Sequence, residues 1–147
     1  TLDSCRIEKA YRHFGHDITC EDHVLEAGLG FAVKSDKQGF LGRDDVIAKK
    51  EKGLEMRMAQ FLLKDAEPLL YHNEPIVRDG EIVGYLSSGN YGHALGGAVG
   101  MGYVPCKGEK KSELLASSYE IDVAGSRVEA EMSFKPLYDP TGTRTKA

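Results

Sequence analysis

Long apolar runs are missing from this sequence of 147 residues, in which charged residues make up 29%. A helix that spans a membrane needs about 20 consecutive residues that are mostly apolar, so we expect no membrane-spanning segment. The start of the chain also lacks the apolar stretch of a secretory signal peptide. This absence predicts a protein that is not secreted.

Basic residues are neither in excess nor clustered. Lys and Arg number 19 against 23 Asp and Glu, which gives a net charge of -4. Proteins that bind nucleic acid through its phosphates need a basic patch, so the composition argues against that class. The cysteines (Cys5, Cys20 and Cys106) are odd in number and far apart. They form no disulfide framework, which favours a reducing compartment.

The length is that of one ordinary domain or one and a half small ones. Hydrophobic residues make up 41%, enough for a real core. The chain starts at Thr1 rather than at Met, so we expect it to be a piece of a larger protein.

Residues 1–53 have a mixed pattern. Residues 1–14 carry apolar side chains at helical spacing, although a short extended segment fits almost as well. Leu25–Lys34 is predicted to be a strand, and Glu26 is its one acid, in a run that glycines interrupt. Acids mostly face water, so an exposed strand carboxylate is the ordinary interpretation. The alternative is a carboxylate that binds a ligand, since an unpaired buried charge is costly.

A metal site is a second alternative for this region, because His13, His16, Cys20 and His23 lie close together in sequence. Their spacing fits no standard zinc pattern, so exposed loop histidines are the favoured interpretation.

The clearest helix signal lies between Gly42 and Gly53. Acids occupy the expected first turn and lysines the last, which complements the helix dipole at both ends. The helix has few apolar residues and is interpreted as a connector. Phe40 and Leu41, just before it, are expected to be buried.

After Gly53 the apolar period changes from about 3.6 to 2. Asp79-Gly80 is a strong hairpin signal, and residues 119–134 form a second hairpin that turns at Gly125-Ser126. The glycine-rich stretch 89–102 lacks the Gly-Lys-Ser/Thr of a phosphate loop, so it is interpreted as a small-residue strand at a tight barrel corner.

These patterns predict a mainly β (α+β) fold. Its C-terminal part is an antiparallel β-barrel or Greek key of about six strands, preceded by a mixed fragment and a short connector helix. The expected boundary separates residues 1–53 from residues 54–147.

Several motifs resemble the aminomethyltransferase (glycine-cleavage T-protein) superfamily. The residues of these motifs are most similar to those in the C-terminal part of dimethylglycine and sarcosine dehydrogenase-like flavoproteins. The motifs that carry the resemblance are Arg6–Arg12, Gly15–Ile18, Leu25–Phe31, Gly42-Arg43, Pro75–Gly84, Ser88–His93 and Gly100–Pro105.

The resemblance implies a function. In that family a flavin domain oxidises an N-methyl amine, and tetrahydrofolate in the T-protein-like part accepts the one-carbon unit. Glu26 matches the glutamate that grips the pterin ring, as a carboxylate accepting two parallel hydrogen bonds can. Arg57 matches a basic stretch near folate, and Tyr71 and Tyr85 are candidate ring contacts. The family's Thr-Pro before the motif is His23-Val24 here.

The resemblance also implies partners. FAD and the catalytic aspartate of the family would belong to flavin and folate domains that precede Thr1, so this chain alone is expected to be inactive. The alternative is a structural or interaction barrel that binds no small molecule. The expected location is the bacterial cytoplasm or the mitochondrial matrix.

Overall fold

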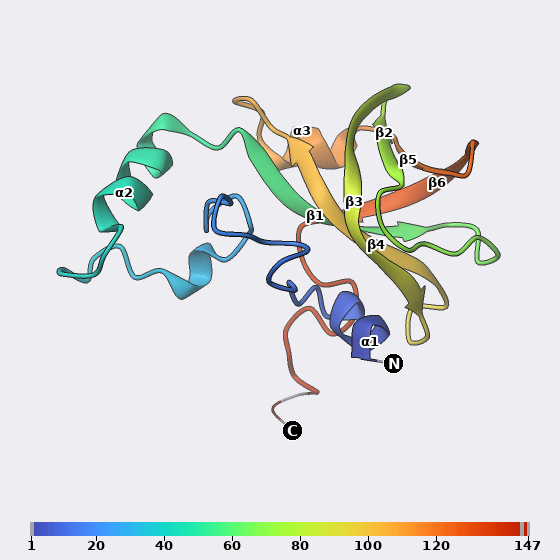
Figure 1. Ribbon diagram of the computed structural model, residues 1–147, viewed down its shortest axis with the longest axis horizontal. Coiled ribbons are helices and arrows are strands. Elements are labelled where there is room, and N and C mark those ends of the chain that lie inside the picture. Colours follow the sequence, from blue (N-terminus) through green and yellow to red (C-terminus); the bar gives the residue numbers. More distant parts are fainter. Residues whose placement is uncertain (1, 145, 147) are drawn as a thin grey trace.

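A computed structural model describes residues 2–144 and 146 (Figure 1). Six strands form the body of the molecule, and short helices lie outside it. The elements in order are α1 (Leu2–Glu8), the 3-10 helix η1 (Gly30–Ala32), α2 (Arg43–Lys52), β1 (Met56–Leu63), β2 (Pro75–Arg78), β3 (Glu81–Gly92), β4 (Gly97–Pro105), α3 (Lys111–Ala116), β5 (Tyr119–Val123) and β6 (Ser126–Ser133). None of the described helices is long and apolar enough to cross a membrane.

The strands close into an antiparallel barrel in the order β1-β4-β3-β2-β5-β6, and β6 pairs back with β1. Three hairpin-connected strands, β2 to β4, are followed in space by β1, which reaches them through the long connection 64–74. This is a Greek-key arrangement. The predicted fold class is therefore confirmed.

Both predicted hairpins are present. Asp79 and Gly80 have φ values of 51° and 92°, and Ala124 and Gly125 have 52° and 89°. Two successive positive φ values are typical of the type I′ turns that match the twist of paired strands. The second turn lies one residue earlier than predicted, because Ser126 already belongs to β6.

The glycine-rich stretch forms the end of β3 and most of the strand β4, and β4 runs on to Pro105 rather than into a helix. A Cβ atom at Gly102 would lie 2.6 Å from the Tyr85 carbonyl oxygen, and one at Gly100 would lie 2.6 Å from Leu86 Cδ1. Glycine is needed there because neighbouring strands approach too closely for a side chain.

Two hydrophobic clusters hold the fold. The first fills the barrel and includes Phe61, Ile76 and Ile121. The second lies outside the barrel, where Ile7 of α1 packs against Met58 of β1 and its neighbours on β4. Both faces of β1 are therefore covered, and α1 is part of the folded body.

The predicted strand Leu25–Lys34 is wrong. Residues 24–28 form turns and Gly30–Ala32 forms η1. The local hydrogen bonds explain this, since the Ala27 and Leu29 N–H groups donate back to the carbonyl oxygens of His23 and Val24. Gly28 has a φ of 73°, which no strand residue adopts.

The helix within residues 1–14 is real but short. It ends at Glu8, and Ala10 has a φ of 53° that the helix could not continue through. The structure also contains α3, a helix that the sequence analysis does not predict, directly after the charged loop at 107–110.

The connector helix is confirmed as α2, between Gly42 and Gly53. It has no buried residue and stands away from the barrel (Figure 1). The expected burial of Phe40 and Leu41 is wrong, because Leu41 is fully exposed and Phe40 is only partly covered. No part of the barrel reaches over this region, and large exposed apolar side chains remain there.

Gly102→Ala tests the close approach in β4. We expect it to lower the free energy of unfolding by about 2 kcal/mol, the usual cost of overpacking against backbone that cannot move. Urea denaturation measures this change. Gly30→Ala is the control, because its Cβ would meet only a side-chain methyl of Leu25 at 3.2 Å. Equal, small losses in both variants would contradict the argument.

Candidate functional site

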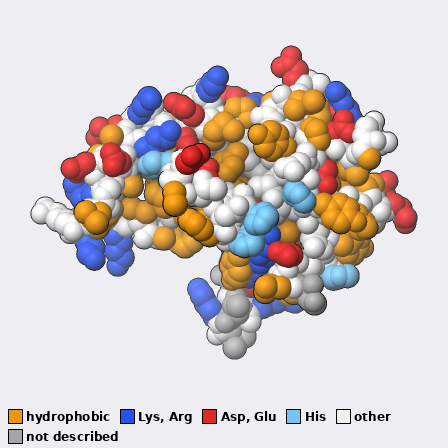
Figure 2. Space-filling view, viewed as in Figure 1, with side chains coloured by type: hydrophobic (Ala, Val, Ile, Leu, Met, Phe, Trp, Pro, Cys, Tyr) orange, Lys and Arg blue, Asp and Glu red, His pale blue; other side chains and the backbone are white. Residues whose placement is uncertain are grey.

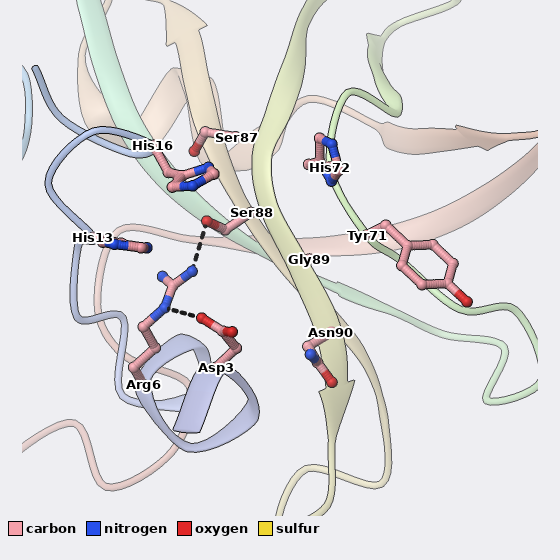
Figure 3. Close-up of a pocket in the computed structure, with 10 residues that line it drawn as sticks. All are labelled: Asp3, Arg6, His13, His16, Tyr71, His72, Ser87, Ser88, Gly89 and Asn90. Carbon is pink, nitrogen blue, oxygen red and sulfur yellow. Dashed lines mark hydrogen bonds and ion pairs between the residues drawn. The ribbon is translucent and has the colours of Figure 1, made fainter. Parts of the chain in front are cut away.

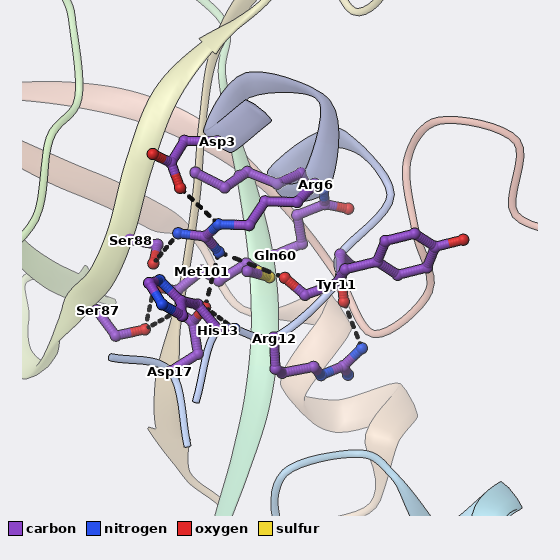
Figure 4. A network of polar contacts seen from close by, with 12 residues as sticks. Asp3, Arg6, Tyr11, Arg12, His13, Asp17, Gln60, Ser87, Ser88 and Met101 are labelled. Atoms are coloured by element: carbon purple, nitrogen blue, oxygen red, sulfur yellow. Dashed lines mark hydrogen bonds and ion pairs between the residues drawn. The ribbon is translucent and has the colours of Figure 1, made fainter. Parts of the chain in front are cut away.

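A buried carboxylate anchors the N-terminal segment to the barrel. Asp17 is 1% exposed. Its Oδ2 accepts hydrogen bonds from Arg6 Nη1 at 2.9 Å and from the His13 N–H at 2.8 Å, and its Oδ1 accepts one from Ser87 Oγ (Figure 4). A buried carboxylate is tolerated only when such donors surround it. Here the donors come from α1, from the loop that follows it and from β3.

Arg6 extends the same network. Its Nε donates to Asp3, and its Nη2 donates to Ser88 Oγ at 3.0 Å. The guanidinium therefore joins α1 to β3, beside the link through Asp17. Because Asp3 and Asp17 both pair with the Arg6 guanidinium, its positive charge is already compensated within the protein. Arg6 is therefore poorly suited to bind an anion.

The first cavity, here called the histidine cavity, has a volume of about 220 Å³ beside Arg6. Histidine side chains lie near the centre of this face in Figure 2. His13 and His16 come from the N-terminal loop and His72 from the 64–74 connection, as Figure 3 shows. Tyr71 lies at the edge, 66% exposed, with its hydroxyl directed away from Arg6.

Metal binding by the histidines receives no support from this geometry. Across residues 2–144 and 146, no group of three or more His, Cys, Asp or Glu side chains is arranged to hold a metal ion. His13 and His16 instead stack with ring centroids 4.7 Å apart.

The second cavity, here called the acidic cavity, has a volume of about 600 Å³ and shares His16, His72 and Ser87 with the first. No lysine or arginine is among the residues found to line it. Its walls combine acids with aromatic and apolar side chains. The acids and aromatic residues are Asp17, Glu21, Asp22, Glu26, Tyr85 and Tyr103.

Glu26 lies on the wall of the acidic cavity and is held by three donors. Its Oε1 accepts hydrogen bonds from the Glu55 N–H at 2.8 Å, the Met56 N–H at 3.2 Å and Lys49 Nζ at 2.9 Å. Burial raises the pKa of this carboxyl, but the hydrogen bond from Lys49 and those from the two N–H groups outweigh it. The pKa therefore lies below its usual value, and the group is ionised at neutral pH.

The second oxygen of Glu26 is left for other donors. Among the described residues, every hydrogen bond to this carboxylate goes to Oε1. Asp17 differs, because both of its oxygens accept hydrogen bonds from the protein. Of these two acids on the cavity wall, Glu26 has the greater capacity for a ligand.

Tyr103 lines the same cavity and carries an unsatisfied group. Its hydroxyl is buried, and no donor or acceptor among the described residues reaches it. Burial also raises the pKa of this hydroxyl, so it stays protonated. A buried hydroxyl without a partner is costly, and because this one is shielded from solvent, Tyr103 lines the cavity with other atoms of its side chain.

Arg57 lies on a third cavity, here called the basic cavity, with a volume of about 550 Å³. Its walls carry three cations, Lys50, Arg57 and Lys111, among apolar side chains such as Leu25 and Phe31. Arg57 Nε is buried without a hydrogen-bond partner among the described residues.

The structure does not bring the three predicted site residues together. Glu26 lines the acidic cavity, Arg57 the basic cavity and Tyr71 the histidine cavity. Tyr85, the other candidate ring contact, lies on the acidic cavity with Glu26.

Sequence reasoning missed Lys49 and Tyr103. Lys49 fits the ordinary role of a lysine that interacts with the dipole at the end of a helix. The pattern around Tyr103 is that of an ordinary tyrosine in a strand. Their positions beside Glu26 depend on contacts between distant segments, for which the sequence pattern carries no signal.

Residues 57–139 match the family described as the glycine cleavage T-protein C-terminal barrel domain. The match covers more than half of the chain, so the chain belongs to this family.

Two relatives match almost the whole length of this chain. The chain is 37% identical over 146 residues to 4-methylaminobutanoate oxidase (formaldehyde-forming) of Paenarthrobacter nicotinovorans, covering 99% of this chain and 17% of the oxidase. It is 32% identical over 149 residues to human mitochondrial sarcosine dehydrogenase, covering 99% of this chain and 16% of that enzyme. The chain thus spans about a sixth of the length of these relatives. The resemblance predicted from the motifs is confirmed.

A solved structure supports the fold. The crystal structure of glycine cleavage system aminomethyltransferase T from Bartonella henselae superposes with a TM-score of 0.78. The superposition covers 94% of this chain and 38% of the other, at 22% identity. At that identity the likeness shows the shared fold.

Asp17→Asn tests the buried anchor. We expect a loss of about 3 kcal/mol in the free energy of unfolding, because the partly buried guanidinium of Arg6 loses its fully shielded charged partner. Urea denaturation measures the loss. Asp3→Asn is the matched control, since Asp3 also pairs with Arg6 but is 59% exposed. A cost below about 1 kcal/mol is expected for that exposed pair. If Asp17→Asn cost no more than the control, Asp17 would not be the anchor.

Proposed function

We propose that this chain is part of a folate-linked demethylating flavoenzyme and contributes one wall of its tetrahydrofolate site. The observation that carries the proposal is the state of Glu26. Its carboxylate is ionised and held in place through Oε1, Oε2 accepts no hydrogen bond from the described residues, and Glu26 lines a cavity of about 600 Å³. The volume lies within the range of small-molecule sites.

The chemistry of a reduced pterin suits this wall. A pterin ring presents an amino group and a ring N–H side by side, and a fixed carboxylate is a strong acceptor for such donors. Because Oε1 already accepts three protein donors, these pterin donors would share Oε2 rather than form two parallel bonds to both oxygens. The cavity lining also offers Tyr85 and Tyr103 as aromatic surfaces. In this proposal Glu26 binds the pterin, and Arg57 and Tyr71 lie further from it, in adjoining parts of the larger site.

The remaining parts of the enzyme are proposed to lie in the rest of a longer protein. Residues 1–53 would be the end of a folate-binding domain, and residues 54–147 the barrel domain that follows it. The family match at 57–139 and the end of α2 at Gly53 support this division. FAD and the oxidation of an N-methyl amine would belong to a preceding domain, in a bacterial cytoplasm or a mitochondrial matrix.

The second candidate is a structural module that binds no small molecule. The exposed apolar side chains of residues 1–53 favour it, because Phe31 is 84% exposed and Leu41 is fully exposed. Surfaces of this kind are typical of contacts with another domain. In this candidate the acidic cavity would be filled by a neighbouring domain.

Glu26→Ala separates the two candidates in the longer protein. We expect transfer of the one-carbon unit to tetrahydrofolate to fall about 30-fold, which corresponds to the loss of about 2 kcal/mol from a charged acceptor. Reduction of the flavin by the amine, followed by stopped-flow absorbance, should stay nearly normal. Glu21→Ala is the control, because Glu21 lines the same cavity but is exposed. A parallel fall in both steps, or no change in either, would show that Glu26 does not bind folate.

Calorimetry with the 147-residue chain gives an independent test. We expect tetrahydrofolate to bind weakly or undetectably, because the other walls of the proposed site would come from the preceding domains. Tight binding by the chain alone would contradict the proposed division of the site.

A further inference from the structure

Three donors from two neighbouring elements converge on one oxygen of Glu26. Lys49 lies in the last turn of α2, while the Glu55 and Met56 N–H groups lie at the start of β1. The main-chain oxygen of Glu26 also accepts a hydrogen bond from the Met58 N–H at 2.8 Å. The backbone and the side chain of Glu26 are therefore both fixed against the start of β1.

The contact with Lys49 is unusual for α2. No residue of this helix is buried, and the helix stands away from the barrel (Figure 1). The Lys52 pair with Glu55 is long, at 3.6 Å, and its side chains are 76% and 61% exposed. Lys49 and Glu26, in contrast, lie 2.9 Å apart with side chains 21% and 13% exposed. This pair is shielded enough from water for its charge interaction to matter.

The three donors differ in what they supply. The two N–H groups are neutral and fix the direction of the carboxylate, whereas Lys49 brings the only full positive charge among the three. Burial of Glu26 favours its protonated form, and the hydrogen bond and the positive charge of Lys49 oppose this effect.

We propose that Lys49 is a positioning residue for the Glu26 carboxylate: it keeps that group ionised and turned so that Oε2 is the oxygen offered to a ligand. In this role α2 does more than connect two segments, because its residue Lys49 holds Glu26 in position. The identity of the ligand rests on the proposed function. The contact between Lys49 and Glu26 is independent of the proposed function.

The charged and titratable groups around Glu26 determine the pH dependence. Lys49 and Glu55 lie on the side of α2 and β1. The groups on the cavity wall are His16, Asp17, Glu21, Asp22, His72 and the two tyrosines at 85 and 103. The folded-state pKa of Glu26 is lowered, so its ionised form persists to a lower pH than in an ordinary glutamate and is lost as the pH falls through that lowered value. Without Lys49 the loss should come at a higher pH.

Carbon-detected NMR of the Glu26 carboxyl tests the inference in the chain itself. In Lys49→Met the titration of Glu26 should move to higher pH, and in Lys49→Arg it should return toward the original position. Lys52→Met is the matched control and should leave the titration unchanged, because Lys52 is exposed and does not contact Glu26. An unchanged Glu26 titration in Lys49→Met, with the amide spectrum of the fold intact, would overturn the inference.

Tetrahydrofolate affinity in the longer protein gives the second readout. Lys49→Met should weaken binding about three- to tenfold at neutral pH, the range expected for loss of a charge-assisted contact, and more as the pH falls. Lys49→Arg should restore most of the affinity. If the Glu26 titration shifts while the affinity stays constant in all variants, Lys49 holds Glu26 as inferred but the proposed folate role of Glu26 is wrong.

Discussion

A carboxylate that is buried without donors would destabilise any fold, and the donors of Asp17 fix how residues 6–17 lie on the barrel. Its donors come from α1, from the loop after α1 and from β3. Each of these segments is held because the same charge needs all of them. The pairing of Ile7 with Met58 in the outer hydrophobic cluster depends on this placement, and so do the cavities between the loop and β3.

Two of the acids that line the acidic cavity, Asp17 and Glu26, differ in how their carboxylates are hydrogen-bonded. Asp17 accepts donors on both oxygens and is fully committed to the fold. Glu26 accepts three donors on Oε1 alone, so it is fixed in place and still able to accept more. A binding carboxylate needs that combination, because a rigid acceptor loses little entropy when a ligand arrives.

Features with local causes could be predicted from the sequence. The turn at Asp79-Gly80, the helix between Gly42 and Gly53 and the small-residue strand β4 each follow from residues next to one another. The strand predicted at Leu25–Lys34 failed because an apolar run with glycines also fits turns, and local backbone hydrogen bonds, such as those from Ala27 to His23 and from Leu29 to Val24, close the turns instead. The partners of Glu26 lie 23 to 30 positions away along the chain, beyond any local pattern. The same limit explains why Glu26, Arg57 and Tyr71 could be chosen singly but not placed relative to one another.

Closure of the barrel has a consequence for assembly. Because β1 pairs with both β4 and β6, the sheet has no open edge that could accept another strand. A neighbouring domain is therefore not expected to extend the sheet by a whole strand, although single backbone contacts, such as that from the Met58 N–H to the Glu26 carbonyl oxygen, do reach from β1 to residues 1–53. A junction of this kind can form without any change in the pairing of the strands.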